Sequence, residues 1–315
     1  MKRFLLVAVL ALFSANMFAG DGDLKLLYWN IQNGMWCGQN DNYDAFVKWV
    51  NDQNPDICVW CEAQSNYISN SDKRMAKEDR YLVEGWGELA QRYGHRYWAI
   101  GGYRDDFPQV VTSKYPIITK KKIVGNDADS VVMHGSGWFQ IEVKGKAINI
   151  VTLHTWPHKH ILTAKDKKLS AANHEGDKFR RIELEYICKN TIGLLPNSDM
   201  GLWMMLGDFN SVSREDNWHY KYPDMDSRFM VHDFIASHTP YIDLINKLYP
   251  NQFIPTIKTT RRIDFIYCSP SLFEMVKSAK VIADTYTTPV REPNKLSNFW
   301  IPSDHLPIVM EIEEM

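Results

Sequence analysis

Short apolar runs, rich in β-branched and aromatic residues and bounded by polar turns, recur along the 315 residues of this chain. Runs of this length and composition are typical of buried strands. One pair of alternating runs flanks Lys144-Gly145-Lys146, which predicts a β-hairpin and therefore an antiparallel part of a sheet. We expect strands at 24–31, 57–61, 97–101, 109–113, 114–118, 137–143, 147–154, 202–206, 263–268, 281–284 and 308–312.

Other segments place apolar residues at helical spacing. Tyr43, Phe46, Val47 and Val50 recur at i, i+3, i+4 and i+7, which predicts a helix capped by Asp41 and ended before Pro55. Further helices are expected at 84–93, 178–191 and 242–249, whereas the Lys-rich segment 156–177 has no period and is expected to be a long loop. A strand, a helix and a second strand at the start of the chain indicate an α/β protein.

The first twenty residues differ in composition from the rest. Lys2 and Arg3 precede an apolar run at 4–13, and small residues follow it. This layout is typical of a secretory signal peptide, and the run is too short to span a bilayer permanently. We therefore expect an exported protein, periplasmic or secreted. No repeat, low-complexity linker or domain break follows, so a single domain over 21–315 is the simplest organisation, with the oligomeric state left open.

Overall composition restricts the classes of partner. Hydrophobic residues make up 45% of the chain, which is enough to form a buried core. The formal net charge is -2, so the chain as a whole does not attract polyanions. A tight, non-specific DNA-coating protein is excluded, and any phosphate must be held by a local site. Of the five cysteines, Cys58 and Cys61 lie in an apolar run, which favours buried packing over redox chemistry; the others are Cys37, Cys188 and Cys268.

Polar residues stand at or near the ends of the predicted strands. Loops at strand ends can bring side chains that are distant in sequence into one cleft. Carboxylate and amide oxygens suit a hard cation such as Mg2+, and the two imidazoles would remain free to act on a phosphate. The residues are Asn30, Glu62, His154, Asp208, Asn210, Asp264, Asp304 and His305.

Local physical arguments support three of these residues. Asp304 and His305 lie between Pro302 and Pro307, which restrict the backbone just before an apolar strand. Asp264 lies within an otherwise apolar strand, where an unpaired carboxylate would be costly. A pairing of Asp264 with His305 would account for it.

Six stretches together resemble the endonuclease/exonuclease/phosphatase superfamily, which includes DNase I-like nucleases, abasic-site endonucleases, sphingomyelinases and inositol-polyphosphate phosphatases. They occur in the family's order and span most of the chain. The resemblance implies an α/β (α+β) four-layer sandwich, with two mixed β-sheets packed face to face and helices outside. The stretches are YWNIQNG at 28–34, PDICVWCE at 55–62, TLH at 152–154, LGDFN at 206–210, RIDFIY at 262–267 and SDHLP at 303–307.

The resemblance also implies roles for single residues. Glu62 would be the principal ligand of Mg2+ (Mn2+ or Ca2+ as alternatives), with Asn30 and Asp304 nearby. Asp208 would orient or deprotonate the attacking water.

The remaining site residues would act on the phosphate. Asn210 and His154 would contact it, and His305, held in its tautomer by Asp264, would bind or protonate a phosphoryl oxygen. In nuclease relatives a Glu partners the middle His; here Asp105 and Asp106 are the candidates for His154. The family often carries an acid where this chain has Gln32.

We expect a Mg2+-dependent phosphoester hydrolase, in first place a secreted phosphodiesterase of nuclease type, whose Lys-rich segment 159–178 would meet backbone phosphates. A phospholipase C or sphingomyelinase-like enzyme is an alternative, since Phe299 and Trp300 could touch a membrane surface. A phosphomonoesterase on inositol phosphates is a third reading. The alternative from another functional class is a non-catalytic binding module with the same fold. The expected partner is a nucleic acid, a phospholipid head group or a small phosphorylated molecule, with no stable membrane span.

Overall fold

The computed structural model describes residues 22–32, 42–63, 85–101, 107–125, 131–193, 198, 200–258, 260–291 and 300–313. Its first six-stranded sheet has the order β11-β14-β1-β2-β4-β3. In this sheet β1 and β2 are parallel and the other neighbours are antiparallel. The strands are β1 (Leu24–Asn30), β2 (Ile57–Cys61), β3 (Tyr97–Ile100), β4 (Val110–Ser113), β11 (Val276–Val281) and β14 (Ile308–Ile312).

The second six-stranded sheet has the order β5-β6-β7-β8-β10-β9, and it is also mixed, because β7 and β8 are parallel. The expected hairpin is present: Val143 pairs with Lys146 across Lys144 and Gly145, which both have positive φ, 49° and 80°. The strands are β5 (Ile117–Ile123), β6 (Ser136–Val143), β7 (Lys146–His154), β8 (Leu202–Asp208), β9 (Ile242–Asp243) and β10 (Asp264–Cys268); β12 (Val290–Arg291) and β13 (Trp300–Ile301) form a separate pair.

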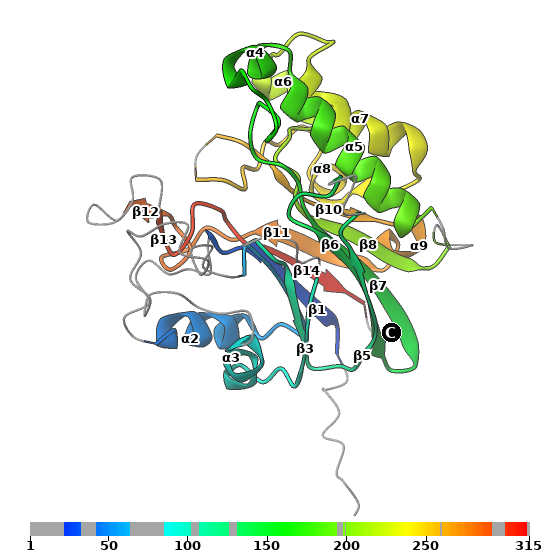
Figure 1. The fold of residues 1–315 in the computed structure, drawn as a ribbon. Helices are drawn as coiled ribbons and strands as arrows, with labels where there is room; N and C mark the ends of the chain where they lie inside the picture. The colour runs from blue at the N-terminus through cyan, green and yellow to red at the C-terminus, as the bar shows by residue number, and fades with distance from the viewer. Residues whose placement is uncertain are drawn as a thin grey trace, which may run out of the picture.

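Helices cover the outer faces of both sheets (Figure 1). Apolar side chains of α2 and α3 pack on the first sheet, and those of α5 and α7 pack on the second. Among the described residues no helix is long and apolar enough to cross a membrane. The helices are α2 (Asp44–Gln53), α3 (Trp86–Arg92), α4 (Lys167–Ala172), α5 (Glu175–Asn190), α6 (Asn217–Tyr220), α7 (Met230–His238), α8 (Leu244–Leu248) and α9 (Pro270–Phe273), with 3-10 turns at Arg214–Asp216 and Ser227–Phe229.

The largest apolar core lies between the two sheets. Leu26 of β1, Ile150 of β7, Leu206 of β8 and Ile266 of β10 are all fully buried in it. Alternate residues of the central strands therefore face this inner core, and the intervening ones face the helices. The four-layer sandwich of two mixed sheets with helices outside is confirmed.

Cys58 and Cys61 illustrate the two faces of β2. Cys58 packs toward the helices and Cys61 toward the inner core, so residues three apart in a strand point in opposite directions. Burial raises the pKa of both thiols well above the ordinary value. The prediction of buried packing is confirmed for these two, and the described Cys188 and Cys268 are also buried and free, while Cys37 lies outside the described residues.

Several predicted boundaries are wrong because polar side chains cap or bend the chain. The segment 114–118 begins as a bend, with Ser113 Oγ accepting from the Tyr115 backbone N–H, so β5 starts at Ile117. The predicted strand 281–284 is the end of β11 followed by a turn in which Asp284 accepts from the backbone N–H groups of Tyr286 and Thr287.

Two further segments differ for the same reason. The expected loop 156–177 contains α4, whose first turn is capped by Asp166, and the start of α5. In the expected helix 242–249, Asp243 instead caps α8 after a two-residue strand. The predicted cap Asp41 lies outside the described residues.

Candidate functional site

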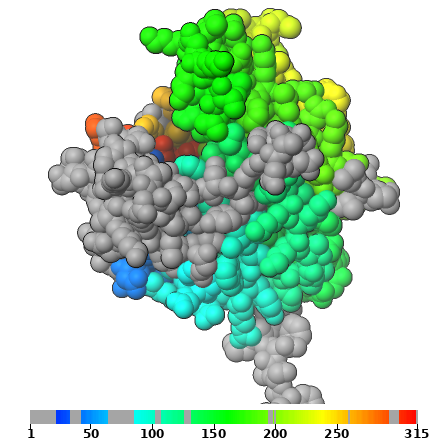
Figure 2. Space-filling view, viewed as in Figure 1, coloured from blue at the N-terminus to red at the C-terminus, as the bar shows by residue number. Residues whose placement is uncertain are grey.

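The strand ends of the two sheets meet at one edge of the sandwich. In the first sheet Asn30 is level with Cys61, so Glu62 follows at the same end of the parallel pair β1 and β2. In the second sheet His154, Asp208 and Asp264 stand level across β7, β8 and β10. The side chains that the sequence assigns to chemistry are thereby collected from both sheets. Figure 2 shows orange and red atoms of the later part of the chain in a hollow below the green segment that contains α4.

Asn30 connects the two sheets through its amide. Its Nδ2 donates to Glu62 Oε1 at 3.2 Å and to Asp208 Oδ2 at 3.1 Å, while its Oδ1 accepts from the Gln32 backbone N–H at 3.1 Å. The amide nitrogen therefore faces the carboxylates, and a ligand role for the Asn30 oxygen would require the side chain to turn. The backbone oxygen of Asn30 accepts from Ser303 Oγ, which ties the end of β1 to the segment before β14.

His305 and Asp264 form the expected pair. His305 Nδ1 lies 2.8 Å from Asp264 Oδ2, and the other carboxylate oxygen of Asp264 accepts from the Tyr28 hydroxyl at 2.7 Å. Burial by itself lowers the pKa of His305, but the carboxylates of Asp264, Asp304 and Asp208 outweigh it and hold that pKa well above the ordinary value. His305 is therefore an imidazolium at neutral pH, and its Nε2–H remains to face a ligand.

Asp208 occupies the centre of the cluster. Its Oδ2 lies 3.8 Å from Nε2 of both His154 and His305, and its Oδ1 accepts from the Asn210 backbone N–H at 2.8 Å. Burial raises the pKa of Asp208 to about 7; Asp264 adds to this and His305 opposes it. The residue before Asp208 has no room for a side chain, because a Cβ at Gly207 would lie 1.9 Å from the Leu153 backbone oxygen.

His154 is buried and differs in charge from His305. Its Nε2 lies 3.8 Å from Glu62 Oε1 as well as from Asp208 Oδ2. Burial lowers the pKa of His154 well below the ordinary value, and the nearby His134 and His305 add to the effect. Of the two imidazoles expected at a phosphate, His305 alone carries charge at neutral pH, and His154 is neutral.

Asp304 and Asn210 lie at the rim of the cluster. Asp304 Oδ1 is 3.9 Å from His305 Nε2, and its backbone oxygen accepts from the Lys258 N–H. Asn210 has a positive φ of 46°, and its Nδ2 donates to the Thr155 backbone oxygen at 3.0 Å. One N–H of the Asn210 amide has no partner among the described residues, so it can donate to a ligand.

Sequence reasoning missed a layer of residues behind His154. His134 stacks on His154 with ring centroids 4.4 Å apart. Glu183, fully buried in α5, accepts from the backbone N–H groups of Met133 and Trp156, each at 2.8 Å. Neither has a signal in the sequence, because Glu183 lies in a charged helix and His134 in a loop. The candidates Asp105 and Asp106 lie outside the described residues.

The donor set fits a hard divalent cation. Two groups place ligand atoms within 4.8 Å of one another: Glu62, His154 and Asp208 form one, and Asp208, Asp264 and His305 form the other. Among the described residues, the carboxyl groups of Glu62, Asp208, Asp264 and Asp304 converge here with a single imidazolium, that of His305. Unbalanced negative charge in a buried site is costly, and carboxylate oxygens are the ligands that Mg2+ prefers.

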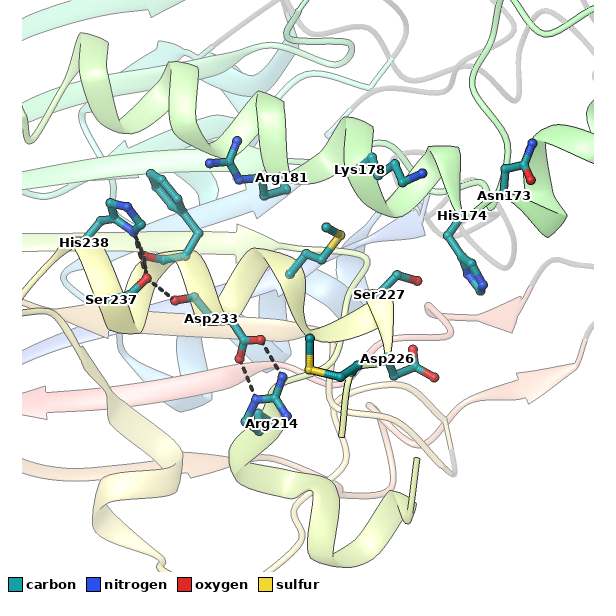
Figure 3. A pocket seen from close by; sticks show the side chains of 13 residues that line it. Asn173, His174, Lys178, Arg181, Arg214, Asp226, Ser227, Asp233, Ser237 and His238 are labelled. Carbon is teal, nitrogen blue, oxygen red and sulfur yellow. Dashed lines mark hydrogen bonds and ion pairs between the residues drawn. The ribbon is translucent and has the colours of Figure 1, made fainter. Parts of the chain in front are cut away.

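Two cavities lie outside this cluster. One, of about 540 Å³, is lined by Asn210 and by basic residues that include Lys159, Arg180, Arg228 and Arg261. The other, of about 440 Å³, lies on the outer helices α5 and α7, and Figure 3 shows Arg214 paired with Asp233 in its wall. The second cavity is lined by none of the strand-end residues.

Trp300 is one of the two aromatic residues that the sequence suggests for contact with a membrane surface. Lys258 Nζ lies 4.0 Å from the centroid of its ring. The other aromatic residue, Phe299, lies outside the described residues.

Comparison with known proteins supports the fold. No protein-family model matches the chain, and no curated protein is similar to it in sequence. An AP endonuclease structure from Archaeoglobus fulgidus matches with a TM-score of 0.58 and 15% identity over 93% of this chain and 100% of that chain. A 3′ phosphatase, NExo, from Neisseria bound to a product DNA hairpin matches with a TM-score of 0.58 and 15% identity over 92% and 99% of the two chains. The 3′-5′ exonuclease NExo from Neisseria meningitidis matches with a TM-score of 0.58 and 16% identity over 92% and 99%. The chain therefore has the DNase I-like fold that the sequence predicts.

Proposed function

We propose that this protein is a Mg2+-dependent phosphoester hydrolase, a phosphodiesterase of nuclease type that directs water onto phosphorus. The observation that carries the proposal is the convergence of Asp208, Glu62 and the Asp264–His305 pair at one edge of the two sheets. A phosphodiester anion repels an incoming hydroxide, so hydrolysis needs positive charge near its non-bridging oxygens and a base for the water.

A bound Mg2+ would supply Lewis acidity at a phosphoryl oxygen, and Glu62 is our candidate for its main ligand, with Asp304 close by. The chain itself supplies the second positive charge through His305, whose Nε2–H donates to a phosphoryl oxygen. Asp264 fixes the ring by accepting from Nδ1. The imidazolium then needs no reorganisation as charge develops on the phosphate.

Asp208 orients and deprotonates the attacking water in this proposal. A pKa of about 7 suits a base that operates near neutral pH. Asn210 acts through its backbone and its side chain. Its backbone N–H donates to Asp208 Oδ1. One N–H of its side-chain amide donates to the Thr155 backbone oxygen, and the other donates to the phosphate. Neutral His154 contacts the phosphate as a hydrogen-bond partner, without a net charge.

Nucleic acid is the proposed substrate class. A matched NExo structure holds a product DNA hairpin, and the chain offers basic side chains on the loops beside Asn210. Phosphate groups attract such side chains without regard to base sequence. We propose export as well, on the strength of the basic and apolar residues at 1–20. Finding the protein with residues 1–20 intact inside the cell that makes it would refute export.

Hydrolysis of bis-p-nitrophenyl phosphate and plasmid DNA, with Mg2+ or EDTA, tests the reaction. We expect turnover that EDTA abolishes, and an Asp208→Asn variant whose kcat is lower by at least about a hundredfold. Asp52→Asn is the matched control, because Asp52 is exposed on α2 and, among the described residues, is paired with Lys48 alone. Sphingomyelin, phosphatidylinositol and inositol phosphates belong in the same panel. Absence of metal-dependent turnover on every substrate would favour a binding module.

A further inference from the structure

The cavity beside Asn210 is lined by polar and basic residues. Asn210 and Ser211, which come two and three residues after the end of β8, are among the residues that line it. Its rim carries Lys159 and Arg261, both exposed and without an ion pair among the described residues. A volume of about 540 Å³ accommodates a nucleotide-sized group.

The other charged groups of the cavity wall are compensated. Arg180 is paired with Asp177, and Arg228 is paired with Asp226 while its guanidinium stacks on Tyr222 at 3.6 Å. The net positive charge of the cavity therefore comes from the two rim residues. An anionic group that enters would face uncompensated charge only from Lys159 and Arg261.

Ser211 is buried, and a hydrogen-bond chain behind it determines where its proton points. Ser211 Oγ lies 3.0 Å from His232 Nε2, and His232 Nδ1 lies 2.8 Å from the Tyr267 hydroxyl. All three side chains are at most 4% exposed. Burial lowers the pKa of His232 to about 3, so the ring is neutral and carries one N–H.

Tyr267 decides which nitrogen of His232 holds that N–H. Among the described residues the Tyr267 hydroxyl has His232 as its single hydrogen-bond partner, and a buried donor without an acceptor costs more than an unused lone pair. Tyr267 therefore donates to Nδ1, and Nε2–H donates to Ser211 Oγ. The proton of Ser211 therefore does not point at His232, and Ser211 is one of the residues that line the cavity.

We infer that Ser211 is a substrate-contacting residue whose hydroxyl proton is held toward the cavity by His232 and Tyr267, and that this cavity takes a second phosphate next to the one that is cleaved. The inference rests on the proposed function. Ser211 and Arg261 then recognise the neighbouring phosphate of a nucleic acid strand, while Asn210 contacts the scissile one. Substrates with a single phosphate leave the cavity empty and bind less tightly.

Two chromogenic substrates with the same leaving group test this. One is thymidine 5′-(p-nitrophenyl phosphate), and the other carries an additional 3′-phosphate. We expect the 3′-phosphate to lower KM by roughly tenfold, as a charge-assisted hydrogen bond can, with kcat changed less than about twofold. Ser211→Ala and Arg261→Gln should each remove most of this preference. Lys280→Ala, an exposed lysine on β11 away from the cavity, should keep it.

Binding and spectroscopy separate this inference from the proposed hydrolysis. Calorimetric titration with thymidine 3′,5′-bisphosphate should show affinity that falls roughly tenfold in Ser211→Ala, while thermal melting confirms that the variant is folded. Nitrogen-15 shifts of His232 should show the Nε2-protonated tautomer. The reverse tautomer, equal KM for the two substrates, or unchanged binding in both variants would each overturn the inference. Bisphosphate binding that depends on Ser211, without hydrolysis of either substrate, would instead support the cavity assignment and refute the proposed hydrolase.

Discussion

His305 Nδ1 lies 2.8 Å from Asp264 Oδ2, although the two residues are 41 positions apart: Asp264 begins β10 of the second sheet, and His305 lies just before β14 of the first. The contact sets both the tautomer and the charge of His305. Asp264 is itself held by Tyr28 from β1, so the pair is supported from the first sheet as well as the second. The electrostatics of the site depend on how these two sheets are packed.

Replacing Asp264 with Asn tests that dependence. The pKa of His305 is raised in the folded protein, so the imidazolium is present below the folded pKa and is lost as pH rises through it. Without the Asp264 charge the pKa of His305 falls. We expect kcat to drop about a hundredfold at neutral pH and the alkaline limb of the pH–rate profile to move to lower pH. Tyr28→Phe removes one hydrogen bond from the same carboxylate and should change kcat much less. An alkaline limb at the wild-type position in the Asp264 variant would show that His305 is not the group being titrated.

Mg2+ should stabilise the folded protein. The carboxylates of Glu62 and Asp208 lie beside the same Asn30 amide, and a cation bound between them would relieve their repulsion. At a Mg2+ concentration about one hundred times its Kd, binding adds about 2.7 kcal/mol, which corresponds to a rise of several degrees in Tm. We expect this rise by calorimetry in the wild type, and its loss in Glu62→Gln. Asp52→Asn should behave as the wild type, and a full response in Glu62→Gln would remove Glu62 from the metal site.

Glu183 should contribute to stability through its two acceptor oxygens. Gln in its place would set an NH2 group against the backbone N–H of either Met133 or Trp156. Leaving one buried group unsatisfied costs about 1–3 kcal/mol in unfolding free energy. Denaturant titration of Glu183→Gln measures it, with Glu185→Gln as the control on the same helix. Equal stability of the two variants would contradict the role of Glu183.

The pH dependence of stability follows from the same side chain. Burial raises the pKa of Glu183 from 4.5 to about 7, so the folded state binds a proton more tightly than the unfolded state. This contribution is fully present below pH 4.5 and is lost as pH rises through about 7. We expect the decline in unfolding free energy between these values to be shallower in Glu183→Gln. Parallel curves for the two proteins would show that Glu183 does not titrate in this range.

Arg262 should contribute much more to the stability of the fold than its neighbour Arg261. Its guanidinium is buried, with Nε 2.8 Å from Asp216 and the two terminal nitrogens each 2.8 Å from Asp243. Arg262→Ala would leave two carboxylates without their cation, at a cost of about 3–5 kcal/mol. Arg261→Ala, at an exposed position, should cost less than about 0.5 kcal/mol. Similar unfolding midpoints for the two variants would contradict this assignment.

Much of the fold could be predicted from the sequence, because the central strands are apolar on one or both faces. The runs at 57–61, 147–154 and 308–312 have a composition that only a buried strand accommodates, and the structure places strands there. The need of Asp264 for a partner could likewise be predicted from the sequence, because an unpaired carboxylate inside an apolar strand is costly. Boundaries were less accurate where capping by Asp166, Asp243 or Asp284 overrides the apolar pattern.

The tertiary structure alone decided how the site residues are charged and oriented. Sequence reasoning placed both His154 and His305 at the phosphate without deciding the charge of each. Burial beside His134 keeps His154 neutral, and three carboxylates keep His305 charged. It expected Asn30 near a metal; in the structure the Asn30 side-chain oxygen accepts from the backbone N–H of Gln32, and the amide nitrogen faces Glu62 and Asp208. From the sequence it was possible to predict which chemical groups stand at the strand ends, but not which sheet each strand belongs to. Their charge, orientation and supporting contacts depend on distances of a few ångströms between segments far apart in the chain, and only the packing of the two sheets sets those distances.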